Sequence, residues 1–147
     1  MSKTLSYRGT IAIGLEERIR LKTLKGKVGY KITQFQLMNT TPGAADAEFV
    51  GKITKVKDPN IGPTVNFTNS DLMAVVYYQD HVSTAYPSST EVIFDNEITN
   101  QDIFVNITDA GGGTTPCNYY IELELMNLSD VEATSLTLKS LRNIASQ

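Results

Sequence analysis

The amino-acid sequence predicts an all-β protein, an antiparallel β-sandwich of the jelly-roll type with a short C-terminal α-helix. In several stretches apolar residues recur at every second position, as in strands that bury one face. These stretches are rich in β-branched and aromatic residues, and turn-forming Gly, Pro and Asn residues separate them. About eight strands are expected, which is the number in a jelly roll. An up-and-down barrel is the alternative architecture.

The clearest strand covers residues 119–125. There the apolar side chains of Ile121 and Leu123 alternate with the carboxylates of Glu122 and Glu124. This two-residue period is typical of a strand with one buried and one solvated face.

A second strand with the same period is expected at 103–108. The connection to 119–125 holds three consecutive glycines and a proline, so we expect these two strands to form an antiparallel hairpin. Within 28–38 the apolar positions change parity, which predicts a β-bulge near Thr33 and Gln34. The other strands are expected at 5–13, 16–22, 28–38, 48–57, 72–80 and 90–95.

The end of the chain, residues 129–145, predicts an α-helix. Ser129 and Glu132 have the spacing of a capping box, in which each side chain bonds the backbone N–H of the other residue. Lys139 and Arg142 suit the negative end of the helix dipole. We expect the helix to pack on the sheet, to cap one end of the sandwich or to dock on a partner. Its apolar stripe consists of Val131, Thr134, Leu138, Leu141 and Ala145.

The chain of 147 residues predicts one domain, 1–147, with 41% hydrophobic and 20% charged residues. Residues 1–8 are either a first strand of the domain or an N-terminal arm that pairs with a neighbouring molecule. Because Cys117 is the only cysteine, no internal disulfide can form. We expect a protein made in the cytoplasm, without a membrane-spanning segment. The net charge of −3 argues against nucleic acid as the partner.

The charges are unevenly distributed along the chain. Residues 1–57 hold eleven bases and four acids, whereas 58–138 hold twelve acids and neither Lys nor Arg. Such segregation favours association through complementary charged patches. The densest basic segment contains Arg18, Arg20, Lys22, Lys25, Lys27 and Lys31.

Three interpretations of this basic segment are open. It could bind an acidic neighbour, and then Glu122 and Glu124 would be the acidic counterpart on another copy. It could be a solvated hairpin without a partner. It could also pair within the molecule, because early and late strands of a jelly roll lie side by side, so that 16–31 would meet acidic 91–124.

No residue pattern indicates catalysis. His81 and Cys117 are the only histidine and cysteine; they could pair across space as nucleophile and base, but a loop histidine and an incidental thiol are the favoured interpretation. Glu122 and Glu124 share a strand face as an acid–base pair would, but two solvated glutamates explain the pattern as well. The triple glycine lacks the Lys-Ser/Thr of a phosphate-binding loop. We therefore expect no catalytic residue and no cofactor.

A metal site has weak support in the sequence. A structural zinc site needs four Cys or His ligands, more than the chain contains. Asp95, Asn96, Glu97 and Asp102 could offer oxygen ligands to calcium, but their spacing is not that of a calcium loop and an ordinary polar turn explains them.

Four segments near the C-terminus resemble small virion proteins of tailed bacteriophages. They are Asp-Asn-Glu-Ile-Thr-Asn-Gln-Asp-Ile-Phe-Val at 95–105, Asn-Tyr-Tyr-Ile-Glu-Leu-Glu at 118–124, Leu-Ser-Asp-Val-Glu-Ala at 128–133 and Leu-Lys-Ser-Leu-Arg-Asn at 138–143. The likeness is closest to capsid-coating (cement or decoration) proteins of marine and freshwater phages, and it covers about the last third of the chain.

The resemblance implies a single jelly roll without enzymatic activity, present in many copies on the capsid surface of the virion. The expected partners are the major capsid protein and other copies of this chain, in a trimer or another cyclic assembly. The alternatives are a neck or tail connector of the virion, a small enzyme that uses Glu122 and Glu124, and a carbohydrate-binding module. The sugar-stacking residues of such a module would be Tyr77, Tyr78, Tyr86, Tyr119 and Tyr120.

Overall fold

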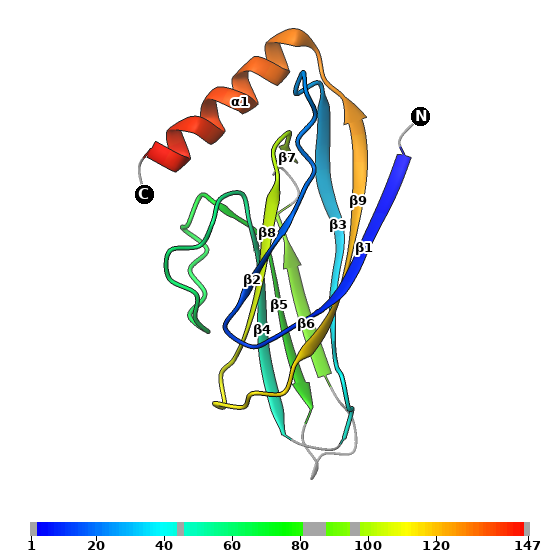
Figure 1. The fold of residues 1–147 in the computed structure, drawn as a ribbon, viewed down its shortest axis with the longest axis vertical. Helices are drawn as coiled ribbons and strands as arrows, with labels where there is room; N and C mark the ends of the chain where they lie inside the picture. Colours follow the sequence, from blue (N-terminus) through cyan, green and yellow to red (C-terminus); the bar gives the residue numbers. More distant parts are fainter. Residues whose placement is uncertain (1–2, 44–45, 81–87, 95–97, 146–147) are drawn as a thin grey trace.

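Two antiparallel sheets pack face to face in the computed structural model, which describes residues 3–43, 46–80, 88–94 and 98–145. Figure 1 shows the sheets along the long axis of the molecule, with the helix α1 (Asp130–Ala145) beside the upper end. Sheet A has the order β1 (Lys3–Ile11), β9 (Cys117–Asn127), β3 (Val28–Asn39) and β7 (Ile98–Thr99). Sheet B has the order β2 (Glu16–Ile19), β8 (Ile103–Asp109), β4 (Ala47–Thr54), β5 (Leu72–Asp80) and β6 (Ser88–Ile93).

The strand order confirms the predicted jelly-roll sandwich. The strands pair in a nested series from the ends of the chain inward: β1 with β9, β2 with β8, β3 with β7 and β4 with β5. This is the arrangement obtained when one long hairpin is rolled into two sheets. β6 is an additional strand at the edge of sheet B, next to β5.

All eight expected strands are present, and the short β7 is an additional one. The sequence prediction was wrong about the hairpin, because β8 belongs to sheet B and β9 to sheet A. The glycine-rich segment between them therefore carries the chain from one sheet to the other. The predicted bulge is confirmed, since the register between β3 and β9 shifts between Ile32 and Gln34.

β2 is shorter than predicted and ends at Ile19 instead of residue 22. Beyond it, the backbone N–H groups of Leu21 and Lys22 donate to the carboxylate of Asp102, both at 2.8 Å, and not to a strand. The exposure of the side chains still alternates through this segment, with Leu21 buried and Lys22 exposed. The Asp102 carboxylate thus accepts the backbone hydrogen bonds that a neighbouring strand would otherwise accept, and the alternation of buried and exposed side chains is kept.

The start of the chain is part of the domain from Lys3 onward. β1 pairs with β9 of the same chain over its whole length, from Lys3 opposite Leu125 to Ile11 opposite Cys117. The segment considered as a possible arm is therefore the first half of an edge strand, and the opposite edge of β1 pairs with no described strand.

The core lies between the two sheets. It consists of the side chains that point inward, which are those of every second residue along each strand. Gly51 of β4 faces inward where the sheets approach closely, and a Cβ atom there would lie 3.0 Å from Leu37 Cδ1 and from Phe35 Cζ. The side chains with no exposed surface include Phe35, Phe49, Ile53, Ile103, Ile107 and Ile121.

The helix begins where the capping box predicts. The N–H of Glu132 donates to Ser129 Oγ at 3.2 Å, and the N–H of Ser129 donates to Glu132 Oε1 at 3.1 Å. Of the three roles expected for the helix, packing of its apolar stripe on the sheet does not occur, because another side of the helix is attached to the domain. The buried side is that of Ala133, whereas Leu138 of the stripe is 52% exposed. No helix of the described residues is long and apolar enough to cross a membrane.

The close approach at Gly51 generates a test of the core. We expect Gly51→Ala to lower the free energy of unfolding by about 1–3 kcal/mol, because the new methyl group forces Phe35 and Leu37 to move. Gly62 is the matched control, since a Cβ there meets no atom within 4 Å, and Gly62→Ala is expected to be neutral or slightly stabilising. Urea unfolding curves measure both; equal effects of the two substitutions would contradict the described packing.

Candidate binding surfaces

The predicted basic segment is partly neutralised within the fold. Arg18 lies on β2, and its Nε donates to Asp102 Oδ2 at 2.7 Å while its guanidinium lies 5.9 Å from the ring centre of Phe104. Burial by itself raises the pKa of Asp102, but the N–H groups of Lys22 and Leu21 and the Arg18 guanidinium outweigh it, so the pKa is lowered. Arg18 is thus part of an internal anchor.

Two further cations of this segment lie near acidic residues that are distant in sequence. Lys27 Nζ is 2.8 Å from Asp130 Oδ1 at the start of α1. Lys31 of β3 is opposite Glu124 of β9 in the register of sheet A. The positions of Arg18 and Lys31 agree with the interpretation that 16–31 meets 91–124 within the molecule, so folding balances part of the linear charge segregation.

The remaining basic residues form an exposed loop. We call residues 20–25 the basic loop; its Arg20, Lys22 and Lys25 are exposed, and the side chain of Leu24 is fully exposed, at 101%. The loop borders the first turns of α1, because Asn100 Nδ2 donates both to the Gly26 carbonyl and to Thr137 Oγ1.

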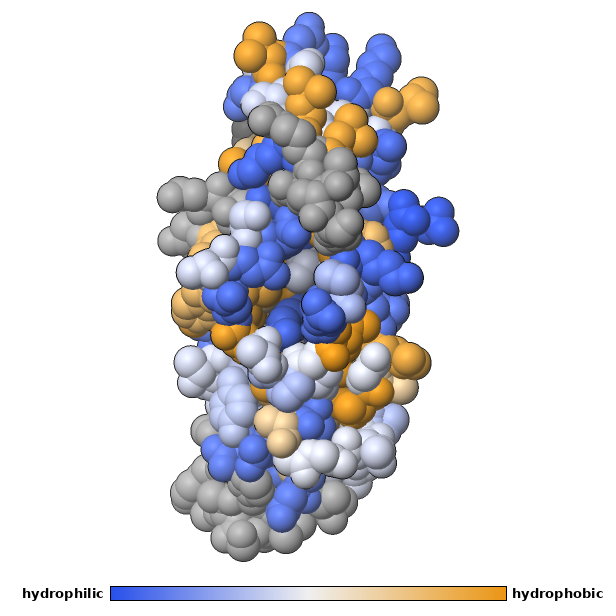
Figure 2. Space-filling view, turned by 90° about the vertical axis from the view of Figure 1, so that its left-hand side faces the viewer, coloured by the Kyte–Doolittle hydropathy of each residue, from blue (hydrophilic) through white to orange (hydrophobic). Residues whose placement is uncertain are grey.

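Apolar side chains are exposed at the same end of the molecule on α1. Figure 2 shows hydrophobic and hydrophilic side chains intermixed at this upper end. Val131 is 79% exposed and Leu141 is 57% exposed. Exposed apolar groups next to cations are typical of protein-binding surfaces, because Arg and large apolar residues contribute much of the binding free energy of interfaces.

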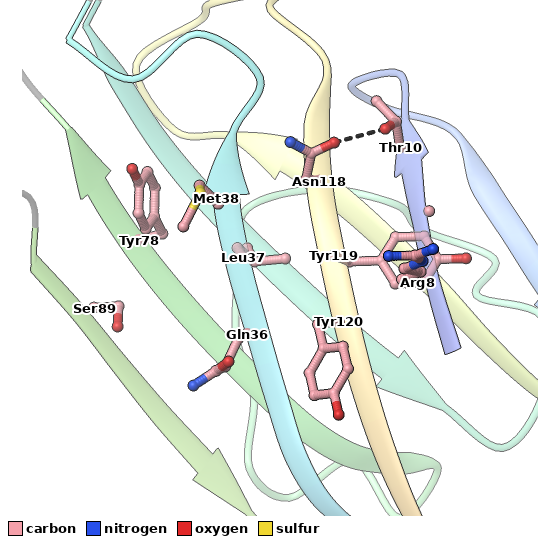
Figure 3. Close-up of a pocket in the computed structure, with 11 residues that line it drawn as sticks. Arg8, Thr10, Gln36, Leu37, Met38, Tyr78, Ser89, Asn118, Tyr119 and Tyr120 are labelled. Atoms are coloured by element: carbon pink, nitrogen blue, oxygen red, sulfur yellow. Dashed lines mark hydrogen bonds between the residues drawn. The ribbon is translucent and has the colours of Figure 1, made fainter. Parts of the chain in front are cut away.

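A groove of about 770 Å³ crosses the outer face of sheet A (Figure 3). Tyr120 of β9 lies at its centre, with Arg8 of β1 and Gln36 of β3 opposite it in the two neighbouring strands. Ser89 and Tyr78 border the groove from sheet B. Its outer-face lining consists of Arg8, Thr10, Gln36, Met38, Asn118 and Tyr120.

Hydrogen bonds orient the polar groups of this groove. Thr10 Oγ1 donates to Asn118 Oδ1 at 2.6 Å, which leaves the Asn118 amide nitrogen pointing away from that bond (Figure 3). The Tyr120 hydroxyl donates to Glu122 Oε2 at 3.2 Å. The groove therefore offers an aromatic ring beside a guanidinium and two amides, a combination that suits a polar ligand with an apolar face.

The five tyrosines suggested for sugar stacking do not form one platform. Tyr78 and Tyr119 are buried in the core, and Tyr86 lies outside the described residues. Tyr77 is opposite Val50 on the outer face of sheet B, whereas Tyr120 is on sheet A. Tyr78, Tyr119 and Tyr120 all line the groove, but of these three only Tyr120 is not buried.

The residues considered for catalysis that the structure describes do not line the groove. Glu122 and Glu124 lie on the outer face of β9, and neither lines the groove. Cys117 is completely buried at the start of β9, and burial raises the pKa of its thiol to about 12, so the thiol stays protonated at neutral pH. His81 lies outside the described residues.

The residues considered for calcium are only partly described. Asp95, Asn96 and Glu97 lie outside the described residues, and Asp102 is bonded to Arg18 and to two backbone N–H groups. Within the ranges that the structure describes, no group of three acidic, His or Cys residues could hold a metal ion.

A buried polar cluster on the outer side of sheet B was missed by the sequence analysis. Glu16, Asn106 and Lys52 are neighbours in three adjacent strands, and Asn106 Nδ2 donates to Asp58 Oδ2 at 3.3 Å. The N–H of Asp58 donates to Glu16 Oε2 at 2.9 Å. The segment after β4 covers this face, since Lys52 is only 7% exposed and Val56 is buried.

Burial controls the charges of this cluster. It lowers the pKa of Lys52, which the Asp58 carboxylate partly offsets, and it raises the pKa of Glu16. A lysine at an outward-facing position of a strand is expected to be solvated, so the local sequence does not indicate that Lys52 is buried.

Comparisons with known proteins do not place the chain in a family. No protein-family model matches it, and no curated protein matches it significantly.

The Asp102 anchor predicts a pH-dependent contribution to stability. Because its folded-state pKa is lowered, this contribution is fully present above the ordinary aspartate pKa of about 3.9 and is lost as the pH falls through the folded value. We expect Asp102→Asn to cost about 2 kcal/mol at neutral pH, by weakening charge-assisted bonds, and less at an acidic pH below the folded-state pKa, where the wild-type carboxyl is protonated as well.

Urea unfolding at the two pH values measures this difference. Arg18→Met is the control, because it removes only the half-exposed partner and is expected to cost less than about 1 kcal/mol. An Asp102→Asn penalty that does not depend on pH would contradict the assigned role of the carboxylate.

Proposed function

We propose that this protein coats and stabilises a phage capsid by binding the major capsid protein and its own copies, without catalysing a reaction. The resemblance of residues 95–143 to capsid-coating proteins supports this proposal, and so does the jelly-roll sandwich that the resemblance implies. A shell protein needs a rigid scaffold that presents the same contact surface in every copy.

The observation that carries the proposal is the basic loop. Leu24 projects with its entire side chain exposed, between Lys22 and Lys25, from a loop that is held at both ends. The Asp102 carboxylate binds the N–H groups of Leu21 and Lys22, and Asn100 binds the carbonyl of Gly26. A fixed apolar residue among cations suits an acidic surface that contains an apolar pocket.

Stabilisation of the shell would follow from mass action. A protein that binds the assembled shell, and not the free subunit, stabilises the shell by about 2.7 kcal/mol per site at a free concentration one hundred times its Kd. Contacts of several copies with one shell strengthen the effect through avidity.

A sedimentation assay with assembled shells of the cognate major capsid protein tests the proposal. We expect the wild-type protein to sediment with shells. Leu24→Asp is expected to weaken binding by about tenfold or more, because it places a charge where the complex would bury an apolar side chain. Leu15→Asp is the control, because Leu15 is also exposed, at 59%, but lies in the corner between β1 and β2. Shells that bind neither wild type nor control would end the capsid proposal.

Electron microscopy of labelled protein on purified virions locates the binding. Label over the whole shell is expected for a coating protein. A single ring at the neck would instead support the connector alternative and contradict coating.

A second candidate function is carbohydrate binding in the groove of sheet A. The groove supports it by placing the Tyr120 ring beside Arg8, Gln36 and Asn118, which supply hydrogen-bond donors around an apolar surface.

Glycan-array binding tests this second candidate. We expect Tyr120→Ala to abolish any signal, because it removes the stacking surface, whereas Tyr77→Ala on the outer face of sheet B leaves it unchanged. An array without any bound glycan, or equal losses in both variants, would remove the candidate.

A further inference from the structure

One side of α1 carries an apolar stripe that no described residue of the chain covers. We call Val131, Thr134, Leu138 and Leu141 the α1 seam. Val131 is 79%, Leu138 52% and Leu141 57% exposed, and Thr134 is exposed as well. Leaving three large apolar side chains in water costs hydrophobic free energy that a partner would recover.

The seam is held in a defined direction by the other side of the helix. Ala133 is buried, and Asn100 Nδ2 donates to the Ala133 carbonyl at 3.2 Å and to Thr137 Oγ1 at 2.9 Å. The ion pair between Lys27 and Asp130 fixes the first turn. The body of the protein therefore presents the seam outward, so the seam is available to another molecule without any change in the fold.

The spacing of the seam identifies the kind of partner. Its residues are three, four and three positions apart, which is the a/d spacing of a coiled coil, and the expected partner is another helix with the same spacing. In an antiparallel pair the a positions of one helix meet the d positions of the other. The seam is then complementary to itself, because Val131 meets Leu141 of a second copy and Thr134 meets its Leu138.

The charges favour the same arrangement. In an antiparallel pair the acidic first turn of each helix, with Asp130 and Glu132, lies beside the end of the other helix that carries Lys139 and Arg142. The helix dipoles then oppose each other favourably. A parallel pair would bring the acidic first turns of both copies together, which is unfavourable.

We propose that the α1 seam binds the α1 seam of a second copy of this chain as an antiparallel helix pair. The inference deepens the self-association part of the proposed function by naming its surface. So short a helix pair covers far less than the roughly 800 Å² per partner of a stable interface, so the pair is weak in dilute solution. It becomes effective where a shell holds neighbouring copies close together.

Disulfide trapping of the purified protein tests the inference and its direction. Val131→Cys and Leu141→Cys are made as separate proteins of different tagged length, and each is oxidised alone and in an equal mixture. We expect the mixture to form the mixed dimer at least about five times more than either protein alone forms its homodimer, because only the mixed pair brings the two thiols together. The native Cys117 is buried and does not interfere. Leu15→Cys, exposed to 59% in the corner between β1 and β2, gives the background of random collision.

The outcomes separate the possibilities. Mixed-dimer yields no higher than those of the Leu15→Cys control overturn the seam contact. A Val131→Cys homodimer as abundant as the mixed dimer overturns the antiparallel direction. Unchanged melting temperatures of the variants show that the fold is intact, as expected for exposed positions.

The trapping experiment contains no capsid protein, so its failure is distinct from failure of the shell-binding assay. Shell binding without seam cross-links would leave the coating proposal standing and refute the seam. Seam cross-links without shell binding would support the seam contact and refute the coating proposal.

Discussion

Closure of the first strand onto the last is the constraint on which the rest of this structure depends. β9 lies between β1 and β3, pairs with both over most of its length, and sends Ile121 and Leu123 into the core. Because its two neighbours are distant in sequence, sheet A forms only when both ends of the chain come together. The nested pairs β2–β8, β3–β7 and β4–β5 follow from that closure.

The outer faces of the two sheets have different surroundings. Sheet A presents rows of polar side chains and the groove around Tyr120. The corresponding face of sheet B is largely covered, so that Lys52 and Asn106 are buried beneath the segment after β4 and bonded or coupled to Asp58. A buried charge of this kind tolerates few substitutions, because loss of one partner leaves the other unpaired at low dielectric. The outer face of sheet A is therefore the sheet face on which side chains can be substituted with less effect on the fold.

The proposed contacts gather at one end of the molecule. The basic loop and the first turns of α1 are connected there through Asn100, which bonds Gly26, Ala133 and Thr137. Together with the Lys27–Asp130 ion pair, Asn100 thus holds the surface proposed for the shell next to the seam proposed for a second copy. A contact at either surface is presented by a fixed geometry, which lowers the entropy cost of binding.

The sequence by itself determined the features that arise from neighbouring residues. Alternation, β-branched content and turn residues predicted eight of the strands, the parity change in β3 predicted the bulge, and the Ser129–Glu132 spacing predicted the start of α1. Each follows from local geometry, because side chains of a strand alternate and a capping box closes within one turn. Of the three interpretations that the charge pattern left open, the ion pair between Arg18 and Asp102 agrees with the internal one, in which 16–31 meets 91–124.

Only the tertiary structure decided which sheet each strand joins and which faces are buried. The chain between β8 and β9 has the residues of a hairpin turn, yet it crosses between sheets, because strand pairing depends on all partners at once. β2 ends early because distant Asp102 captures its backbone. Lys52 is buried and Leu138 exposed for the same physical reason: burial is set by what packs on a side chain, and alternation along the chain does not contain that information.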